Sequence, residues 1–242
     1  MSEKMYHGGI PAPEDLLRRT PGQLRRALGG YFQALDAGKD AAALYRTGFR
    51  LLRMAENLDS LEGVFPRLAD DDIVGFCRQV MERSEYPAEL LGLTLAFRCD
   101  KVSHIIAMDA ALLERLLLNL LSNAFGATPR GGTVTLEVRL ERETVLLSLS
   151  DTGAGMEPDA PPRGLGLGLP ICRSIAREHG GALVLTAREG GGTAATVSLP
   201  NRRAAGHAPE RYEAELLGGF NRTLAELSDV LPEQAYVQRF LD

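Results

Sequence analysis

The chain has 242 residues and a formal net charge of −5, and 45% of its residues are hydrophobic. This length and composition allow one or two domains with a real core. The negative charge balance offers no basic surface for nucleic acid or anionic membranes. The start of the chain lacks an apolar signal segment, and no run approaches the roughly 20 apolar residues of a membrane span. We therefore expect a cytoplasmic protein without membrane insertion and without a nucleic-acid partner.

Residues 12–62 are predicted to form a helical hairpin, because apolar residues keep helical spacing on two arms that flank a turn at residues 36–40. The two apolar stripes are Leu24, Leu28, Tyr31, Phe32 and Leu35, then Leu44, Leu51, Ala55, Leu58 and Leu61. One hairpin would expose these stripes along its length. We therefore expect two copies to pair into a four-helix bundle, which makes the protein a homodimer.

The three cysteines, Cys77, Cys99 and Cys172, are odd in number and far apart. Their spacing predicts neither a zinc site nor a disulfide framework. We expect buried or idle thiols in a reducing compartment.

A further helix is predicted from residue 110, with Asp109 as its N-cap and leucines at helical spacing behind it. Asn119 and Asn123 are four residues apart and share a face beside the leucine stripe. A carboxamide can give Mg²⁺ one neutral oxygen ligand, while phosphates and waters supply the others. The alternative is that both asparagines lie on a solvated helix face, and the pair taken alone favours this alternative, because short motifs often match by chance.

Two glycine-rich motifs follow this helix. Asp151-Thr-Gly-Ala-Gly-Met156 ends a strand predicted over residues 145–150, and its aspartate can accept a hydrogen bond from an adenine amino group. Gly164-Leu-Gly-Leu-Gly-Leu169 precedes a helical pattern, where glycines and a helix N-terminus suit phosphate binding. A third glycine turn at residues 190–193 precedes a strand predicted over residues 195–199. Each cluster alone could be an ordinary turn, but their order predicts one nucleotide site.

Leu118-Asn-Leu-Leu-Ser-Asn-Ala124 and the two glycine motifs closely resemble the N, G1 and G2 boxes of sensor histidine kinases. Their ATP-binding domain is of the GHKL type, which type II topoisomerases, ATP-dependent heat-shock chaperones and MutL repair proteins share. The resemblance covers about residues 65–200. It implies an α+β fold, with a dimerisation hairpin at residues 1–64 and a two-layer α/β sandwich at residues 65–201. Residues 202–242, which the resemblance does not cover, are expected to form a helical extension.

The same resemblance implies ATP and Mg²⁺ as cofactors. It makes Asn123 the metal ligand. The nucleotide-binding residues would be Asn123, Asp151, Gly153, Gly155, Gly164, Gly166, Gly168, Leu169 and Thr193.

Departures from the family pattern bear on catalysis. Residues 50–62 resemble the second hairpin helix of the family, but the first arm has Leu16 or Gly22, depending on the register, where the phosphoacceptor histidine belongs. Neither side chain can attack phosphorus, so we expect no conventional autophosphorylation. The link at residues 157–163 is too short and proline-rich to close as an ATP lid. Arg163 is either a phosphate contact or a solvated arginine. Asn119 is the one candidate for a catalytic role.

Residues 210–242 show two short helical patterns, either packed on the ATP domain or forming a docking segment for a partner. Two functions remain open. The first is a histidine-kinase-like, ATP-dependent phosphotransferase of a two-component pathway, with a response regulator as partner. The second is a non-catalytic dimeric pseudokinase or adaptor that binds a response regulator or another kinase. The intact nucleotide motifs favour the first function, and the missing histidine with the short link favours the second.

Overall fold

The structure, a computed structural model, describes residues 41–59, 64–155, 166–204 and 221–236. The second arm of the predicted hairpin is helix α2 (Ala41–Asp59). The first arm, the link with Arg163, and Gly164 lie outside the described residues. The pairing of two hairpins into a bundle therefore stays a prediction.

A five-stranded sheet in the order β2-β4-β5-β7-β6 forms one layer of the protein. Its strands are β2 (Thr94–Cys99), β4 (Thr133–Leu140), β5 (Thr144–Asp151), β6 (Ala182–Ala187) and β7 (Thr193–Pro200). Strands β2 and β4 are parallel, whereas the other neighbours are antiparallel. A separate antiparallel ribbon pairs β1 (Ala69–Asp72) with β3 (Ile105–Met108). The central strand β5 thus ends at Asp151.

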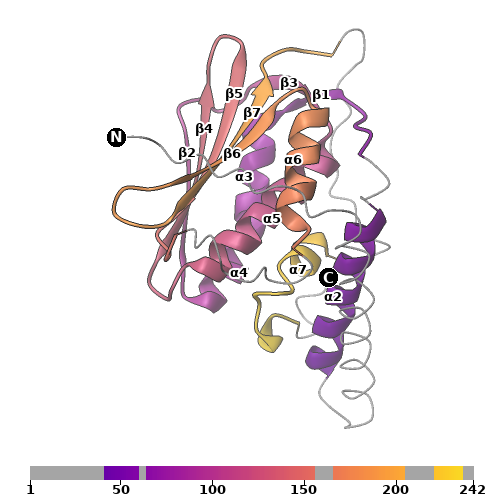
Figure 1. Cartoon of the computed structure of the whole chain (residues 1–242), viewed down its shortest axis with the longest axis vertical. Helices are drawn as coiled ribbons and strands as arrows, with labels where there is room; N and C mark the ends of the chain where they lie inside the picture. The colour runs from indigo at the N-terminus through magenta and orange to yellow at the C-terminus, as the bar shows by residue number, and fades with distance from the viewer. Residues whose placement is uncertain (1–40, 60–63, 156–165, 205–220, 237–242) are drawn as a thin grey trace.

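Helices form the second layer. They are α3 (Ile73–Arg83), α4 (Glu85–Leu91), α5 (Ala110–Ala127) and α6 (Gly168–Glu178). Figure 1 shows α3, α5 and α6 on one side of the sheet. Every second residue of β5 is buried, namely Val145, Leu147 and Leu149, as the twofold side-chain period of a strand requires. Each such side chain stabilises the fold by about 1.5–3 kcal/mol relative to an exposed one.

The start of α5 and the end of α6 are fastened to each other. Asp109 caps α5 by accepting a hydrogen bond from the Leu112 N–H through Oδ1 (3.1 Å). The Asp109 N–H donates to Nε2 of His179 (3.1 Å), and Nδ1 of that ring lies 2.8 Å from the Ile175 carbonyl oxygen. Because a backbone N–H can only donate, His179 must carry its proton on Nδ1. The histidine at the end of α6 therefore fixes the two main helices of the layer relative to one another.

A third set of helices lies beyond α5 and α6, on the side away from the sheet (Figure 1). It contains α2 and the C-terminal segment, by which we mean residues 221–236, with α7 (Arg222–Glu226) and the 3₁₀ helix η2 (Glu233–Tyr236). Tyr236 is fully buried, and its ring centroid lies 5.5 Å from that of Phe49 on α2. The Tyr236 hydroxyl donates to the Leu224 carbonyl oxygen (3.0 Å), which closes the segment on itself.

The predicted fold class is confirmed: residues 69–200 form a mixed α+β unit with a sheet on one side and helices on the other. The strands predicted at residues 145–150 and 195–199 are β5 and β7. None of the helices in the described ranges is long and apolar enough to span a membrane. The boundaries of the three predicted domains stay predictions.

Candidate nucleotide-binding site

Asp151, the last residue of β5, lies at one end of the site and is only 5% exposed. Its Oδ1 accepts a hydrogen bond from the Gly153 N–H at 2.8 Å, so the carboxylate itself starts the turn that follows the strand. Arg188 donates from Nη1 to the Asp151 carbonyl oxygen. A buried carboxylate at a strand end is a poor core residue but a strong acceptor.

Two glycines let backbone segments close around Asp151. A Cβ at Gly192, whose φ is +90°, would collide with the Asp151 carbonyl oxygen. A Cβ at Gly153 would collide with the Ala127 carbonyl oxygen at the end of α5. The loop after β5, the turn before β7 and the end of α5 are therefore packed backbone against backbone, at positions where a side chain does not fit.

Helix α5 carries both asparagines of the first motif, but the structure gives them different surroundings. Asn123 is the one exposed residue of this fully described helix, whereas Asn119 is 0% exposed. For Asn119 the alternative of a solvated helix face is therefore wrong. The reason is that the start of α6 and α7 pack on α5 at Asn119, so the offset from the leucine stripe leads to solvent only one turn later, at Asn123.

The second glycine motif reaches α5 at the start of α6. Gly166 has a φ of +71°, and Gly168 is the first residue of α6. A Cβ at Gly168 would lie 2.9 Å from Oδ1 of Asn119, so the helix end sits directly against the carboxamide. The N-cap residue of α6 is Leu167, which supplies no side-chain acceptor to the first N–H groups. Such a helix start is suited to an anion.

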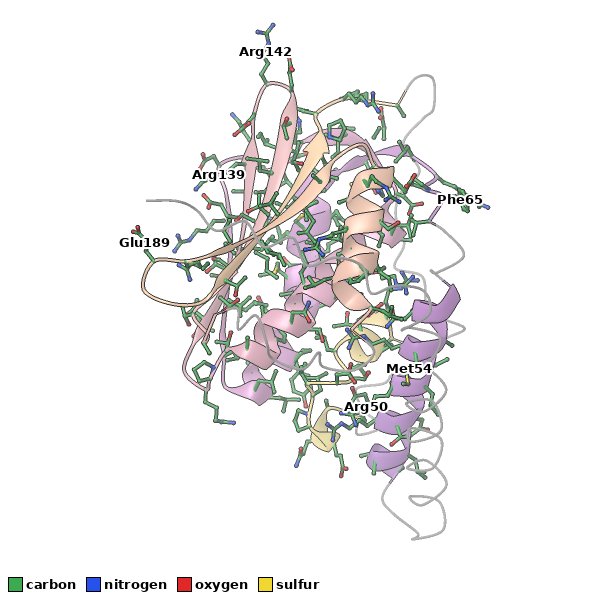
Figure 2. The ribbon with its side chains drawn as sticks, in the orientation of Figure 1. Arg50, Met54, Phe65, Arg139, Arg142 and Glu189 are labelled. Carbon is green, nitrogen blue, oxygen red and sulfur yellow. The ribbon has the colours of Figure 1, made fainter. Side chains whose placement is uncertain are left out.

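The structure divides the predicted residues between two places: one group lies where β5 ends and β7 begins, and the other described residues lie on α5 and at the start of α6. Asp151, Gly153 and Gly155 form the loop after β5, beside Gly192, which the sequence had placed only in a turn. Thr193 begins β7 and is half-buried. Leu169, also half-buried, packs against the core from the first turn of α6. Gly164 lies outside the described residues. Glu189, at the tip of the β6–β7 turn, points away from this arrangement (Figure 2).

Sequence reasoning missed a cluster of charged side chains that surrounds Asn119. Arg53 of α2 donates from Nη2 to Asn119 Oδ1 at 3.1 Å, and Asn119 donates from Nδ2 to Oε2 of Glu226 in α7 at 3.1 Å. Arg53 also donates from Nε to Glu226 Oε2 (3.1 Å) and from Nη1 to Asp229 Oδ2 (2.8 Å). A second arginine of the cluster, Arg115, has Nε 3.6 Å from Glu226 Oε1.

Burial dominates the electrostatics of this cluster. Glu226 is 0% exposed, and desolvation raises the pKa of its carboxyl above the ordinary value, while Arg53 and Arg115 act in the opposite direction. Apart from its place between the apolar residues Ala225 and Leu227, no pattern in residues 210–242 distinguishes Glu226 from a solvated acidic residue.

The three cysteines are free thiols, and Cys77 and Cys172 are buried. Burial raises the pKa of the Cys172 thiol to about 12 and that of Cys77 further. Within the described residues, no group of three His, Cys, Asp or Glu side chains could hold a metal ion.

Comparison with known proteins identifies the domain. Residues 108–203 match the family described as histidine kinase-, DNA gyrase B-, and HSP90-like ATPase. The chain is similar to the sensor histidine kinase Hik2 of Thermosynechococcus vestitus, with 30% identity over 213 residues, which is 80% of this chain and 50% of Hik2. It is also similar to the sensor protein KdpD of Clostridium acetobutylicum, with 31% identity over 113 residues, 40% of this chain and 13% of KdpD.

Solved structures show the same fold. Full-length ShkA in complex with AMPPNP has a TM-score of 0.60 and 27% identity, covering 82% of this chain and 48% of ShkA. Histidine kinase ThkA in complex with the response regulator protein TrrA has a TM-score of 0.62 at 20% identity, covering 77% of this chain and 61% of ThkA. The chain spans half or less of the length of these curated relatives. Through its ATPase domain, the chain belongs to the sensor histidine kinase family.

Proposed function

We propose that the chain binds ATP with Mg²⁺ and acts in two-component signal transduction as a histidine-kinase-like, ATP-dependent phosphotransferase. The observation that carries the proposal is the buried Asp151 carboxylate at the end of β5, enclosed by the backbone at Gly153 and Gly192. Since Oδ1 already accepts from the Gly153 N–H, Oδ2 is the atom that would accept from the adenine amino group. The AMPPNP complex of ShkA supports a nucleotide ligand.

The remaining predicted residues fit the other parts of a nucleotide. Gly153 and Gly155 allow the loop after β5 to lie close to the base, and Thr193 lies next to Gly192 at the start of β7. Gly166 and Gly168 would present backbone N–H groups of the α6 start to phosphate oxygens. Gly164 and Leu169, from the same motif, complete the nucleotide-binding set that we propose.

Asn123 fits a magnesium ligand. Its side chain is exposed on a helix that is otherwise covered, and it lies one helical turn after Asn119, which touches the start of α6. A carboxamide oxygen is a suitable ligand for an ion that takes its other ligands from phosphates and water. When bound, the ion would neutralise negative charge on the phosphates.

Phosphoryl transfer would rest on positioning and electrostatics, because the chain lacks a histidine at the phosphoacceptor position. The acceptor would then lie on another protein. A response regulator is the partner that we propose, as the ThkA complex with TrrA supports. We further propose that the hairpin makes the protein a homodimer in the cytoplasm.

One observation favours a second candidate, a non-catalytic dimeric pseudokinase or adaptor. The Asn119 carboxamide, the candidate for a catalytic role, is buried and bonded to Arg53 and Glu226. A protein of this kind would bind a response regulator or another kinase through α2. It would transfer no phosphoryl group from ATP to any partner, which distinguishes it from the first candidate.

The test is a calorimetric titration of the full chain with Mg²⁺ and a non-hydrolysable ATP analogue. Asp151→Asn keeps the acceptor for Gly153 but turns the other oxygen into a donor, so we expect a loss of about 1–3 kcal/mol of binding free energy. The matched control is Asp100→Asn, which makes the same change on an exposed loop. Equal affinities for wild type and Asp151→Asn would refute the assignment of the site.

A further inference from the structure

Helix α7 of the C-terminal segment lies between α2 and α5 (Figure 1) and packs on both. Toward the domain, Arg222 donates from Nη1 to the Ala111 carbonyl oxygen of α5 at 3.1 Å. Toward α2, the Ser228 carbonyl oxygen accepts from Arg50 Nε at 3.0 Å. Figure 2 labels this arginine on α2. The segment therefore contacts two elements that are far apart in the sequence.

Glu226 is the residue of the segment that reaches the nucleotide site. Its carboxylate accepts hydrogen bonds from Arg53 Nε and from Asn119 Nδ2, both at 3.1 Å. Arg53 is itself 8% exposed, and Asp229 of the same segment binds its Nη1 at 2.8 Å. The guanidinium that α2 extends toward α5 is thus held by two acidic side chains of the C-terminal segment.

This arrangement uses the whole hydrogen-bonding capacity of the Asn119 amide nitrogen. Nδ2 donates to the Arg115 carbonyl oxygen (3.0 Å) and to Glu226, while Oδ1 accepts from Arg53. The same carboxamide lies against Gly168, the first residue of α6. Docking of the segment therefore acts on the end of the site where the proposed function places the phosphates.

We propose that the C-terminal segment is an autoinhibitory element, in which docked Glu226 withholds Arg53 and Asn119 from nucleotide phosphates. A guanidinium binds a carboxylate and a phosphate through the same N–H groups, so Glu226 and a phosphate compete for Arg53. Release of the segment frees this cation on α2 and the carboxamide on α5 together. The inference rests on the proposed ATP site and names its regulation.

Competition of this kind is reciprocal. If docking weakens nucleotide binding by some factor, nucleotide binding weakens docking by the same factor. Couplings between two sites typically amount to about 5-fold to 150-fold in affinity. In the wild-type protein, saturating Mg²⁺ and ATP analogue should therefore accelerate hydrogen exchange at the backbone amides of residues 221–236.

The test compares Glu226→Ala with Glu233→Ala in the full chain. Both changes remove one glutamate from the same segment, but Glu233 is exposed and lies outside the Asn119 cluster. Two quantities are measured: hydrogen exchange of residues 221–236, and calorimetric affinity for Mg²⁺ and the ATP analogue. We expect Glu226→Ala to accelerate exchange and to bind the analogue at least about fivefold more tightly, with Glu233→Ala like wild type.

The contrary outcomes are separable. Accelerated exchange with unchanged or weaker affinity would overturn autoinhibition, and so would unchanged exchange in Glu226→Ala. Absence of analogue binding by wild type and variant alike, with the segment released, would refute the proposed ATP site and the autoinhibition with it. If Glu226→Ala does not fold, Asp229→Ala takes its place, because Asp229 is a third exposed and also binds Arg53. The same two measurements then apply, with a smaller effect expected.

Discussion

The two ends of the candidate site differ in how they are built. At the Asp151 end, backbone segments meet at Gly153 and Gly192, and the bonds join residues that are near one another in the sheet or the sequence. At the Asn119 end, charged side chains of α2, α5 and α7 meet, and Asn119 and Glu226 are 107 residues apart. The first end is fixed by shape and the second by charge. We therefore expect the part of the site proposed for adenine to be rigid, and the part proposed for the phosphates to change its conformation more readily.

The largest expected effect comes from a substitution that disrupts the Asp151 end of the site. Gly192→Ala adds a Cβ that collides with the Asp151 carbonyl oxygen, so the loop after β5 must move. The matched control is Gly190→Ala, which has a similar φ (+86° against +90°) but open space around the added atom. Since the backbone conformation is alike, the overlap should cost Gly192→Ala about 1–3 kcal/mol more in unfolding free energy.

Denaturant unfolding measures that difference, and calorimetry measures nucleotide binding in the same proteins. We expect Gly192→Ala to lose binding of the ATP analogue and Gly190→Ala to retain it. If the two variants were equally stable, close backbone approach would not be what fixes this end of the site.

The Asp151 end could be predicted from the sequence, because the strand and the turn that build it are neighbours in the chain. Strand β5 alternates buried and half-buried residues up to Asp151, and the glycines that follow it indicate a tight turn. The Asn119 end could not be predicted in this way. The hydrophobic periodicity around Glu226 predicts a helix, but it does not predict which residues Glu226 contacts. The packing of α7 on α2 and α5 decides which arginine an acidic residue contacts. This packing cannot be read from the spacing of residues within the segment.

An intermediate effect concerns the pH dependence of the Asn119 end. Glu226 lies among Arg53, Arg115, Arg222 and Glu56, and burial raises the pKa of its carboxyl above 4.5. The folded protein therefore holds this proton at pH values where the unfolded chain releases it. The stability that Glu226 contributes is fully present below the unfolded pKa and declines as the pH rises through the folded pKa.

Glu226→Gln tests this sign, because an amide mimics the protonated carboxyl and does not titrate. The unfolding free energies of wild type and variant are measured from acid to neutral pH. We expect the stability of the variant relative to wild type to increase as the pH rises. One unit of pKa difference corresponds to about 1.4 kcal/mol. A difference that stays constant with pH, or reverses, would show that the arginines hold the carboxylate ionised.

The smallest expected effect concerns the rate at which the cysteine thiols react with an alkylating reagent. At pH 8 the half-buried Cys99 should react with an alkylating reagent first, because burial keeps Cys77 and Cys172 protonated and covered. Glu226→Ala should speed labelling of Cys172, which senses the charge of Glu226, by about fivefold for about 1 kcal/mol of local destabilisation. Cys77 serves as the internal reference. Mass spectrometry of timed samples measures the labelling rates of Cys77 and Cys172. An equal increase of both rates would mean global rather than local opening.

Docking of the C-terminal segment joins parts of one chain, with residues 201–204 after β7 held on the ribbon by Arg202 and Ala204. It is therefore a first-order equilibrium, and the docked fraction does not change when the protein is diluted. Pairing of two hairpins, in contrast, is second order and follows protein concentration. A dilution series would separate the two controls: any concentration dependence in nucleotide binding belongs to assembly, and what persists at the lowest concentration belongs to the segment.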